Sequence, residues 1–308
     1  MSEIILHHYP QSPVSEKVRV GLGIKHLAWA SVEMPRLPPK PDLVALTGGY
    51  RRAPVMQIGA DIYCDSQCIL RELQRRYPQP TFYPGGGDGL PWALSRWTDG
   101  ELFTHAVAIV LGHAPAKLPP EFAADRGRLY FGPDWNLERL HEDLPHVVAQ
   151  MRGALGWLDQ RLSGGRAFVL GSEPGLPDAA CYYIIWFLRG RWDSGTKFLA
   201  EFPALCAWEA RVRAIGHGTP RDMRASEALE IARASEPATP ESGDPNDPQK
   251  IAPGQRVGVV PMTDSGDAEV VGIVRAVDRE TIAVLRDDPR VGAVCVHFPR
   301  VGYRVRPN

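Results

Sequence analysis

Short apolar runs alternate with helix-like spacing of apolar residues at the beginning of the chain. Residues 4–6 and 54–58 are apolar stretches of strand length, whereas the apolar positions within 14–22 fall on one face of a helix. A second helical spacing covers residues 69–77 and ends at two prolines. This alternation predicts an α/β domain, in which the histidine pair at 7–8 lies at the surface end of the first strand.

A change of pattern follows the segment Pro-Gly-Gly-Gly-Asp-Gly at 84–89, which we interpret as a linker because glycine makes regular structure costly. From residue 91 to about residue 234 strand patterns are absent and long helical periodicities dominate. This region is predicted to be an all-helical bundle, with helices over 94–110, 137–162, 178–188 and 203–215.

The last part of the chain changes character twice. Residues 235–250 are rich in proline and nearly free of apolar side chains, which predicts an extended or disordered tether. Beyond it, five valine-rich runs predict the strands of a small β-barrel-like extension. These runs are 256–260, 269–277, 281–286, 294–298 and 303–305. We therefore predict three domains, over residues 1–83, 91–235 and 250–308.

Charge and composition narrow the range of functions. The 308 residues carry a formal net charge of −1, and a nearly neutral chain does not concentrate nucleic acid or acidic lipid. The sequence contains no apolar run long enough to span a membrane and no basic, apolar leader. Its five cysteines include no Cys-x-x-Cys pair, so neither a disulfide framework nor a metal site is indicated. We expect a cytoplasmic protein that acts on a small molecule.

The most informative segment is the junction between the first strand and the first helix, where Ser12 stands in a polar turn. Free amides at a helix start carry about half a positive charge, so a hydroxyl held there can stabilise an anion such as a thiolate. The structural alternative is that Ser12 only caps the helix, a contribution of about 1 kcal/mol. Ser15 and Tyr9 are alternative hydroxyls for the same role.

Three motifs in order resemble the cytosolic glutathione transferase family. They are Ser-Pro-Val-Ser-Glu-Lys-Val-Arg at 12–19, Ala-Pro-Val at 53–55 and Asp-Ser at 65–66, followed by a helical domain. The resemblance covers residues 3–220 and implies a thioredoxin-like first domain, glutathione as cosubstrate without a metal, and a homodimer. It says nothing about the β-rich extension.

The resemblance also implies roles for individual residues. Ser12 occupies the catalytic position of related classes, and because it is not cysteine, activation of a bound thiol is favoured over mixed-disulfide chemistry. Pro54 corresponds to the family's cis-proline, which presents the backbone of Val55 to the cysteinyl part of glutathione. Asp65 and Ser66 correspond to the pair that receives the γ-glutamyl end, although helix capping by the same two residues is the structural alternative.

Arg52 stands where relatives have a basic or amide residue near the glycyl carboxylate of glutathione, and Arg51 is an equally suitable donor. The sequence departs from the family pattern just before this point. Many members have Asn-Pro there, whereas this chain has Leu-Thr-Gly-Gly-Tyr at 46–50. In the helical domain the usual Ser/Thr-x-x-Asp capping box is Gly-Leu-Pro-Asp at 175–178, so the serine bond is missing.

Two functions follow from these observations. The leading one is a glutathione transferase of the alkyl/aryl type, in which Ser12 lowers the pKa of the glutathione thiol and the sulfur attacks an apolar electrophile, as in detoxification. The alternative is a non-catalytic glutathione-transferase-like binding protein whose β-rich extension docks a partner.

Overall fold

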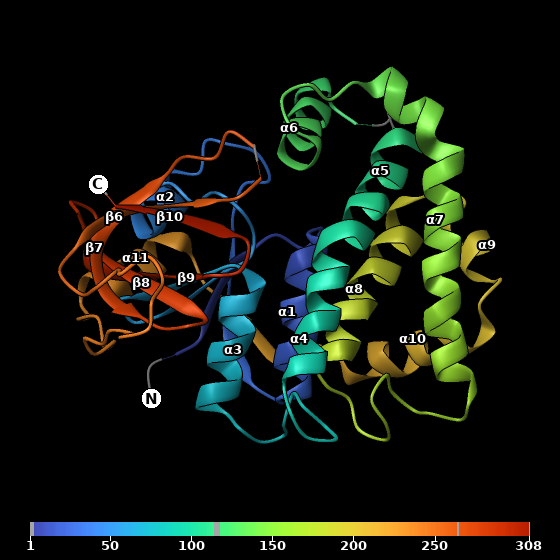
Figure 1. The fold of residues 1–308 in the computed structure, drawn as a ribbon, viewed down its shortest axis with the longest axis horizontal. Coiled ribbons are helices and arrows are strands. Elements are labelled where there is room, and N and C mark those ends of the chain that lie inside the picture. Colours follow the sequence, from blue (N-terminus) through green and yellow to red (C-terminus); the bar gives the residue numbers. More distant parts are fainter. Residues whose placement is uncertain (1–2, 114–117, 264, 308) are drawn as a thin grey trace. The chain divides into compact units, whose positions relative to one another are not determined.

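The computed structural model describes residues 3–113, 118–263 and 265–307 (Figure 1). The chain divides into two compact units. The first unit combines Met1–Ser15, Ala28–Arg75 and Thr219–Asn308, and the second combines Glu16–Leu27 with Arg76–Gly218. The division into three domains at the predicted boundaries stays a prediction, but the β-rich extension and the N-terminal sheet belong to the same compact unit.

The N-terminal sheet has the predicted thioredoxin-like arrangement. Strand β1 (Ile5–His8) is parallel to β2 (Ala28–Glu33) and antiparallel to β3 (Val55–Ile58), and β3 is antiparallel to β4 (Asp61–Cys64). The helices of this region are α1 (Pro13–Ile24), α2 (Pro41–Thr47) and α3 (Ser66–Arg76). Helix α1 begins in the first unit and continues into the second.

All five strands predicted for the extension are present. They form an antiparallel array in the order β10-β6-β7-β8-β9, and the last of these pairs in parallel with β4. Asp61 of β4 lies opposite Cys295 of β9. The extension thus continues the N-terminal sheet. The strands are β6 (Arg256–Pro261), β7 (Val270–Val277), β8 (Thr281–Asp288), β9 (Gly292–Pro299) and β10 (Tyr303–Pro307).

The other edge of the N-terminal sheet is covered by an unpredicted strand. β5 (Thr219–Asp222) pairs in parallel with β2, and α11 (Ala225–Arg233) follows it. The all-helical prediction up to residue 234 was therefore wrong for these four residues. All four are exposed and polar or proline, so no apolar alternation marks them as a strand. Pairing with a buried neighbour, β2, decides their conformation.

A shared hydrophobic core joins the extension to the N-terminal sheet. Valines of the extension pack in one cluster with Leu46, Tyr50, Ile62 and Cys64. The Phe298 and Tyr303 rings of the extension both lie in this cluster. Because one continuous core contains both parts, removing the extension would expose apolar surface of the N-terminal sheet.

The segment over residues 235–250 is irregular as predicted, but it is not a free tether. The Ala238 amide donates to Asp61 Oδ2 at 2.8 Å, and the Thr239 hydroxyl donates to Asp61 Oδ1 at 2.5 Å. Farther along, Asp247 accepts from Arg300 Nη1 at 2.7 Å. Hydrogen bonds near both ends therefore fasten a sequence whose composition alone indicates disorder.

The second unit is helical, as predicted. The predicted helix over 94–110 is divided into α4 (Gly89–Trp97), a π-helical turn (Thr98–Leu102) and α5 (Phe103–His113), with Gly100 outside helical geometry. Figure 1 shows α5, α7 and α8 side by side. Among the described helices, none combines the length and apolar character needed to cross a membrane. The remaining helices are α6 (Pro120–Phe131), α7 (Leu137–Ser163), α8 (Leu176–Arg191), α9 (Gly195–Leu199) and α10 (Pro203–Ile215).

Asp178 supplies the acidic half of the capping box at the start of α8. Its Oδ2 accepts from the Gly175 amide at 2.9 Å, and its Oδ1 accepts from the Val169 amide at 2.9 Å and from Trp208 Nε1 at 2.7 Å. The side chain is fully buried, and burial raises the pKa of Asp178. One carboxylate therefore fixes the start of α8, the preceding loop and α10.

We expect Asp178→Ala to lower the free energy of unfolding by at least about 3 kcal/mol, because three buried donors lose their acceptor. Urea denaturation of the full chain measures this loss. The matched control is Asp143→Ala, which removes an exposed carboxylate from helix α7 and should change stability by less than about 0.5 kcal/mol. Equal effects of the two substitutions would contradict the assigned role of Asp178.

The prediction that His7 and His8 lie at the surface was wrong, since both are buried. His7 Nε2 lies 2.9 Å from Gln57 Oε1, and Gln57 Nε2 donates to the carbonyls of Gly59 and Ala228. Burial lowers the pKa of His7 to about 4, and the bond to Gln57 only partly opposes this effect. The imidazole is therefore neutral in the folded protein at pH 7.

This depressed pKa predicts acid sensitivity. Below pH ~6.5 the unfolded chain protonates His7 whereas the folded chain does not, so the free energy of unfolding falls as pH decreases towards 4. Between pH 6.5 and pH 5 the titration of His7 lowers the free energy of unfolding by about 2 kcal/mol. In His7→Gln residue 7 cannot titrate, so the difference between the free energies of unfolding at pH 6.5 and at pH 5 should be smaller by that amount. Denaturation curves at the two pH values measure this difference. An unchanged pH dependence in the variant would exclude His7 as its source.

Candidate functional site

The predicted serine stands at the start of α1, immediately after β1 and its turn. Ser12 Oγ accepts a hydrogen bond from the Ser15 amide at 3.2 Å, and the Ser12 amide donates to the Tyr9 carbonyl at 3.1 Å. Ser12 is therefore the N-cap of the helix, with 2% of its surface exposed. The cap uses the oxygen as an acceptor, and the hydroxyl proton donates to no other residue that the structure describes.

The two alternative hydroxyls differ in their surroundings. Ser15 is fully buried, and among the described residues its Oγ has no hydrogen-bond partner. The Oε1 atom of Gln11, at the other side of the cap, is also buried without a partner. Tyr9 packs into the core, with Lys40 Nζ 5.7 Å from its ring centroid. Ser12 is therefore the only one of the three hydroxyls that the structure shows as the N-cap of α1.

The peptide bond between Ala53 and Pro54 is cis, as the resemblance implies. Val55 opens β3 and lies in register with both His7 of β1 and Cys64 of β4. With a paired strand on each side, Val55 offers no open edge for an added strand. Ala53 lies just outside the strand and is partly exposed, so its backbone is the better placed to pair with a ligand. The sequence analysis did not identify Ala53.

Asp65 and Ser66 lie at the start of α3. Asp65 has φ = 74°, a conformation that costs a residue with a side chain about 1–3 kcal/mol and that is concentrated at functional sites. Its Oδ1 accepts from the Gln67 amide at 2.9 Å, so the capping alternative is also present. Its Oδ2 accepts from the Tyr303 hydroxyl at 3.0 Å. Ser66 is buried as the first residue of the helix.

Arg51 and Arg52 share one carboxylate, that of Asp267 in the loop between β6 and β7. Arg52 Nε and Nη2 lie 2.8 and 2.5 Å from Asp267 Oδ2, and Arg51 Nε lies 3.0 Å from Oδ1. The hydroxyl of Ser265 donates to Oδ2 at 2.7 Å, and Arg52 Nη2 also donates to Thr263 Oγ1 at 2.9 Å. Burial would raise the pKa of Asp267, but Arg52, Ser265 and Arg51 together hold it below its usual value.

Packing against the extension accounts for the unusual loop over residues 46–50. Gly48 has φ = 78°, and a Cβ atom there would lie 2.6 Å from Arg286 Nε. Gly49 has φ = 134°, and its Cβ would lie 3.2 Å from that of Ala268. The Tyr50 hydroxyl lies 3.4 Å from that of Tyr303. The Leu-Thr-Gly-Gly-Tyr sequence thus gives the extension room to approach closely.

The extension therefore contributes two residues that the sequence analysis missed, Asp267 beside Arg52 and Tyr303 beside Asp65. The polar stretch over 263–267 indicates a turn between strands, but nothing in it points to a partner near residue 52. The structure brings the extension to the charged side chains at both predicted ends of the tripeptide.

One further polar cluster lies where β4 meets β9. Potential ligand atoms of Asp61, Cys295 and His297 lie within 4.8 Å of one another. Burial would raise the pKa of Asp61, but hydrogen bonds from His297 (2.9 Å), Thr239 and Ala238 bring it below its usual value. Burial raises the pKa of Cys295 to about 12, so its thiol is protonated at neutral pH. The carboxylate is thus occupied by protein donors, and the cluster fastens strands together.

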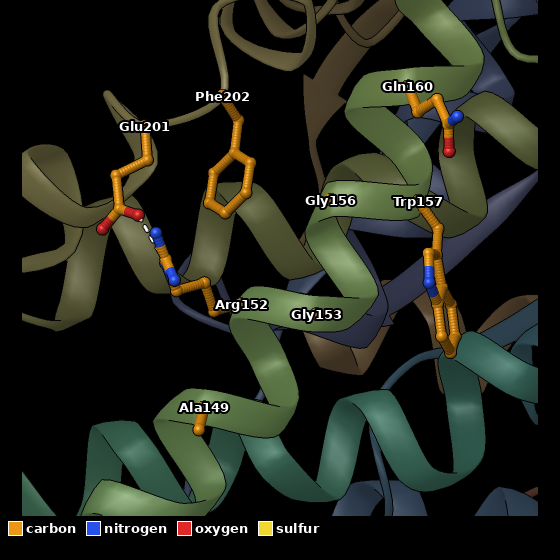
Figure 2. Close-up of a pocket in the computed structure, with 8 residues that line it drawn as sticks. All are labelled: Ala149, Arg152, Gly153, Gly156, Trp157, Gln160, Glu201 and Phe202. Atoms are coloured by element: carbon orange, nitrogen blue, oxygen red, sulfur yellow. Dashed lines mark hydrogen bonds and ion pairs between the residues drawn. The ribbon is translucent and has the colours of Figure 1, made fainter.

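The helical unit contains a separate open hollow of about 470 Å³ along α7 (Figure 2). The Trp157 ring is 66% exposed there, and Arg152 Nε lies 2.6 Å from Glu201 Oε2. None of the predicted site residues lines this hollow. In helix α5, Phe103 is buried against Tyr130 and Tyr183. Residues lining the hollow are Ala149, Arg152, Gly153, Gly156, Trp157, Gln160, Glu201 and Phe202.

Comparisons with known proteins agree with this arrangement. The family models for the N-terminal and C-terminal domains of glutathione S-transferase match residues 6–81 and 123–211. A structure described as a GST-like protein from Pseudomonas syringae shares 36% sequence identity, with a TM-score of 0.80, over 100% of both chains. Its match therefore includes the extension. No curated protein matches the chain significantly.

More distant structures match a smaller share of the chain. Glutathione transferase GSTFuA3 from Phanerochaete chrysosporium is 18% identical, with a TM-score of 0.55, over 70% of this chain and 98% of that one. The Tau class enzyme MiGSTU from mango, Mangifera indica, is 16% identical, with a TM-score of 0.53, over 75% and 97%. These two show a common fold. The two family models and the full-length match at 36% identity establish that the chain belongs to the glutathione S-transferase family.

Proposed function

We propose that the protein binds a glutathione-type thiol at the start of α1 and activates its sulfur for transfer to an electrophilic carbon. The observation that supports this most directly is the bonding state of Ser12. Its oxygen accepts the Ser15 amide, and its proton is left to donate to a ligand. A hydroxyl polarised by a helix amide is a good donor to a thiolate.

The energetic effect of such a bond is sufficient. A free thiol has a pKa of ~8.5, and a charge-assisted hydrogen bond of roughly 1.5–3 kcal/mol lowers it by about one to two units. The amides at the helix start add up to roughly 1 kcal/mol. Together these contributions make the thiolate the main form of a bound thiol near pH 7.

The rest of the ligand is held by groups around the same end of the sheet. The backbone of Ala53, next to the cis bond, takes the cysteinyl part in place of the paired backbone of Val55. The Asp65 carboxylate pairs with the γ-glutamyl ammonium, and Ser66 with the helix amides takes the γ-glutamyl carboxylate. Arg52 lies on the glycyl side, together with Asp267.

The reaction is either addition or displacement. The thiol proton is lost to solvent as the thiolate forms, and the sulfur pair then makes a bond to carbon. In addition, the neighbouring carbon takes up a proton, whereas in displacement a leaving group departs with the bonding pair. A homodimer and a cytoplasmic location remain predictions from the family resemblance and the sequence.

The second candidate is a glutathione-transferase-like binding protein without turnover. One observation favours it: the extension already engages Arg52 and Asp65, which are charged residues expected to hold glutathione. In that case the extension, in addition to its place in the sheet, docks a partner. Turnover of an activated aryl chloride by the purified chain distinguishes the two candidates, because only the enzyme consumes it.

We expect Ser12→Ala to reduce turnover of an activated aryl chloride at pH 7 by about 10- to 100-fold. Without the Ser12 hydrogen bond the pKa of the bound thiol rises by about one to two units, so less of it is thiolate. Thiol affinity should change less than about threefold. The pH at which the bound thiol ionises, followed by thiolate absorbance, should rise by the same one to two units. The lost N-cap should lower the free energy of unfolding by about 1 kcal/mol.

Ser15→Ala is the matched control, one helical turn away. Its hydroxyl has no partner among the described residues, so its removal should leave turnover within about twofold. The opposite result, reduced turnover in Ser15→Ala with full turnover in Ser12→Ala, would assign the hydrogen bond to the thiolate to Ser15. Thiol binding without turnover in the unmodified protein would support the binding candidate instead.

A further inference from the structure

The carboxylate of Asp267 lies where a transferase of this kind would receive a carboxylate from its ligand. Arg52 is the residue that the resemblance places at the glycyl end of glutathione, and Arg51 is the alternative. Both arginines donate to Asp267, one to each carboxylate oxygen. The side chain of Asp267 is only 2% exposed. A residue of the protein therefore occupies both candidate donors for the ligand's terminal carboxylate.

Several features make this arrangement a fixed part of the site. Ser265 is buried and donates to the same carboxylate, and Thr263 accepts from Arg52. The loop that holds them is anchored by β6 and β7, which pair with each other within the sheet. Moving Asp267 away would leave the partly buried Arg52 guanidinium without its main counterion, which is unfavourable.

The opposite end of the site is different. The Asp65 carboxylate accepts from the Tyr303 hydroxyl and from the Gln67 amide. Its negative charge is the complement of the γ-glutamyl ammonium of the proposed ligand. The site thus keeps an anion for the γ-glutamyl ammonium but already holds an anion at the glycyl end.

We propose that Asp267 is a specificity-determining residue, which takes the place of the ligand's terminal carboxylate and selects γ-glutamyl thiols whose glycyl end is uncharged. Amides and esters of glutathione at the glycine are ligands of this class. This inference rests on the proposed function, since it assumes a thiol tripeptide at the start of α1. A free glycyl carboxylate is disfavoured because it meets a like charge beside arginines that are already paired.

Isothermal titration of the full chain with two probes tests the proposal. The probes are glutathione and its glycyl monoethyl ester, which differ in the charge at the glycine. The unmodified protein should bind the ester at least tenfold more tightly than glutathione. This measurement needs no substitution, so it remains decisive if a variant does not fold.

The variant Asp267→Asn identifies the residue responsible. It keeps the size and an acceptor oxygen but removes the negative charge, so glutathione affinity should rise at least tenfold while ester affinity changes less than threefold. The matched control, Asp287→Asn, removes an exposed carboxylate from β8 of the same unit and should leave both affinities unchanged.

Each other outcome has a defined meaning. Glutathione binding as tight as ester binding in the unmodified protein would overturn the proposal, as would an ester preference that Asp267→Asn does not reduce. In both cases thiol binding itself, and with it the proposed function, would stand. Failure of both probes to bind the unmodified protein and the variant would overturn the proposed function and this inference together.

Discussion

Parallel pairing between β4 and β9 is the interaction on which the rest of the first unit depends. It joins a thioredoxin-like sheet of four strands to the five strands of the extension, through Asp61–Tyr63 and Cys295–His297. The same junction contains the hydrogen bonds of Asp61 with His297 and Thr239. Because strands are rigid over this length, the pairing also fixes where the loops of the extension lie.

Those loops meet the predicted thiol site. With β9 held against β4, the turn before β10 places Tyr303 beside Asp65, and the β6–β7 loop places Asp267 beside Arg52. The N-terminal part is adapted to this contact, since Gly48 and Gly49 leave no side chain in the way. The departures from the family pattern are therefore coupled, because a bulkier loop and this extension do not fit together.

Local patterns predicted much of this architecture. Valine-rich alternation predicted each strand of the extension, and helical spacing predicted α10 to its first and last residue. β5 was missed because Thr219–Asp222 contains no apolar alternation, and the surface placement of His7 failed because Gln57, a distant residue, supplies its partner. Motif order identified Arg52 and Asp65, whereas Asp267 lies 215 residues from Arg52 and leaves no local trace. Contacts of that separation are set by topology, which composition and periodicity do not encode.

The order in which the strands occur along the chain has a consequence for biosynthesis. The thioredoxin-like strands are made first, but the strands that cover their two edges, β5 and β9, come after the helical unit. While the ribosome is still making the C-terminal region, β2 and β4 present open edges that invite pairing with other chains. The nascent protein is thus most prone to misassembly before its final strands have been made. Slow translation of the C-terminal region would lengthen this period.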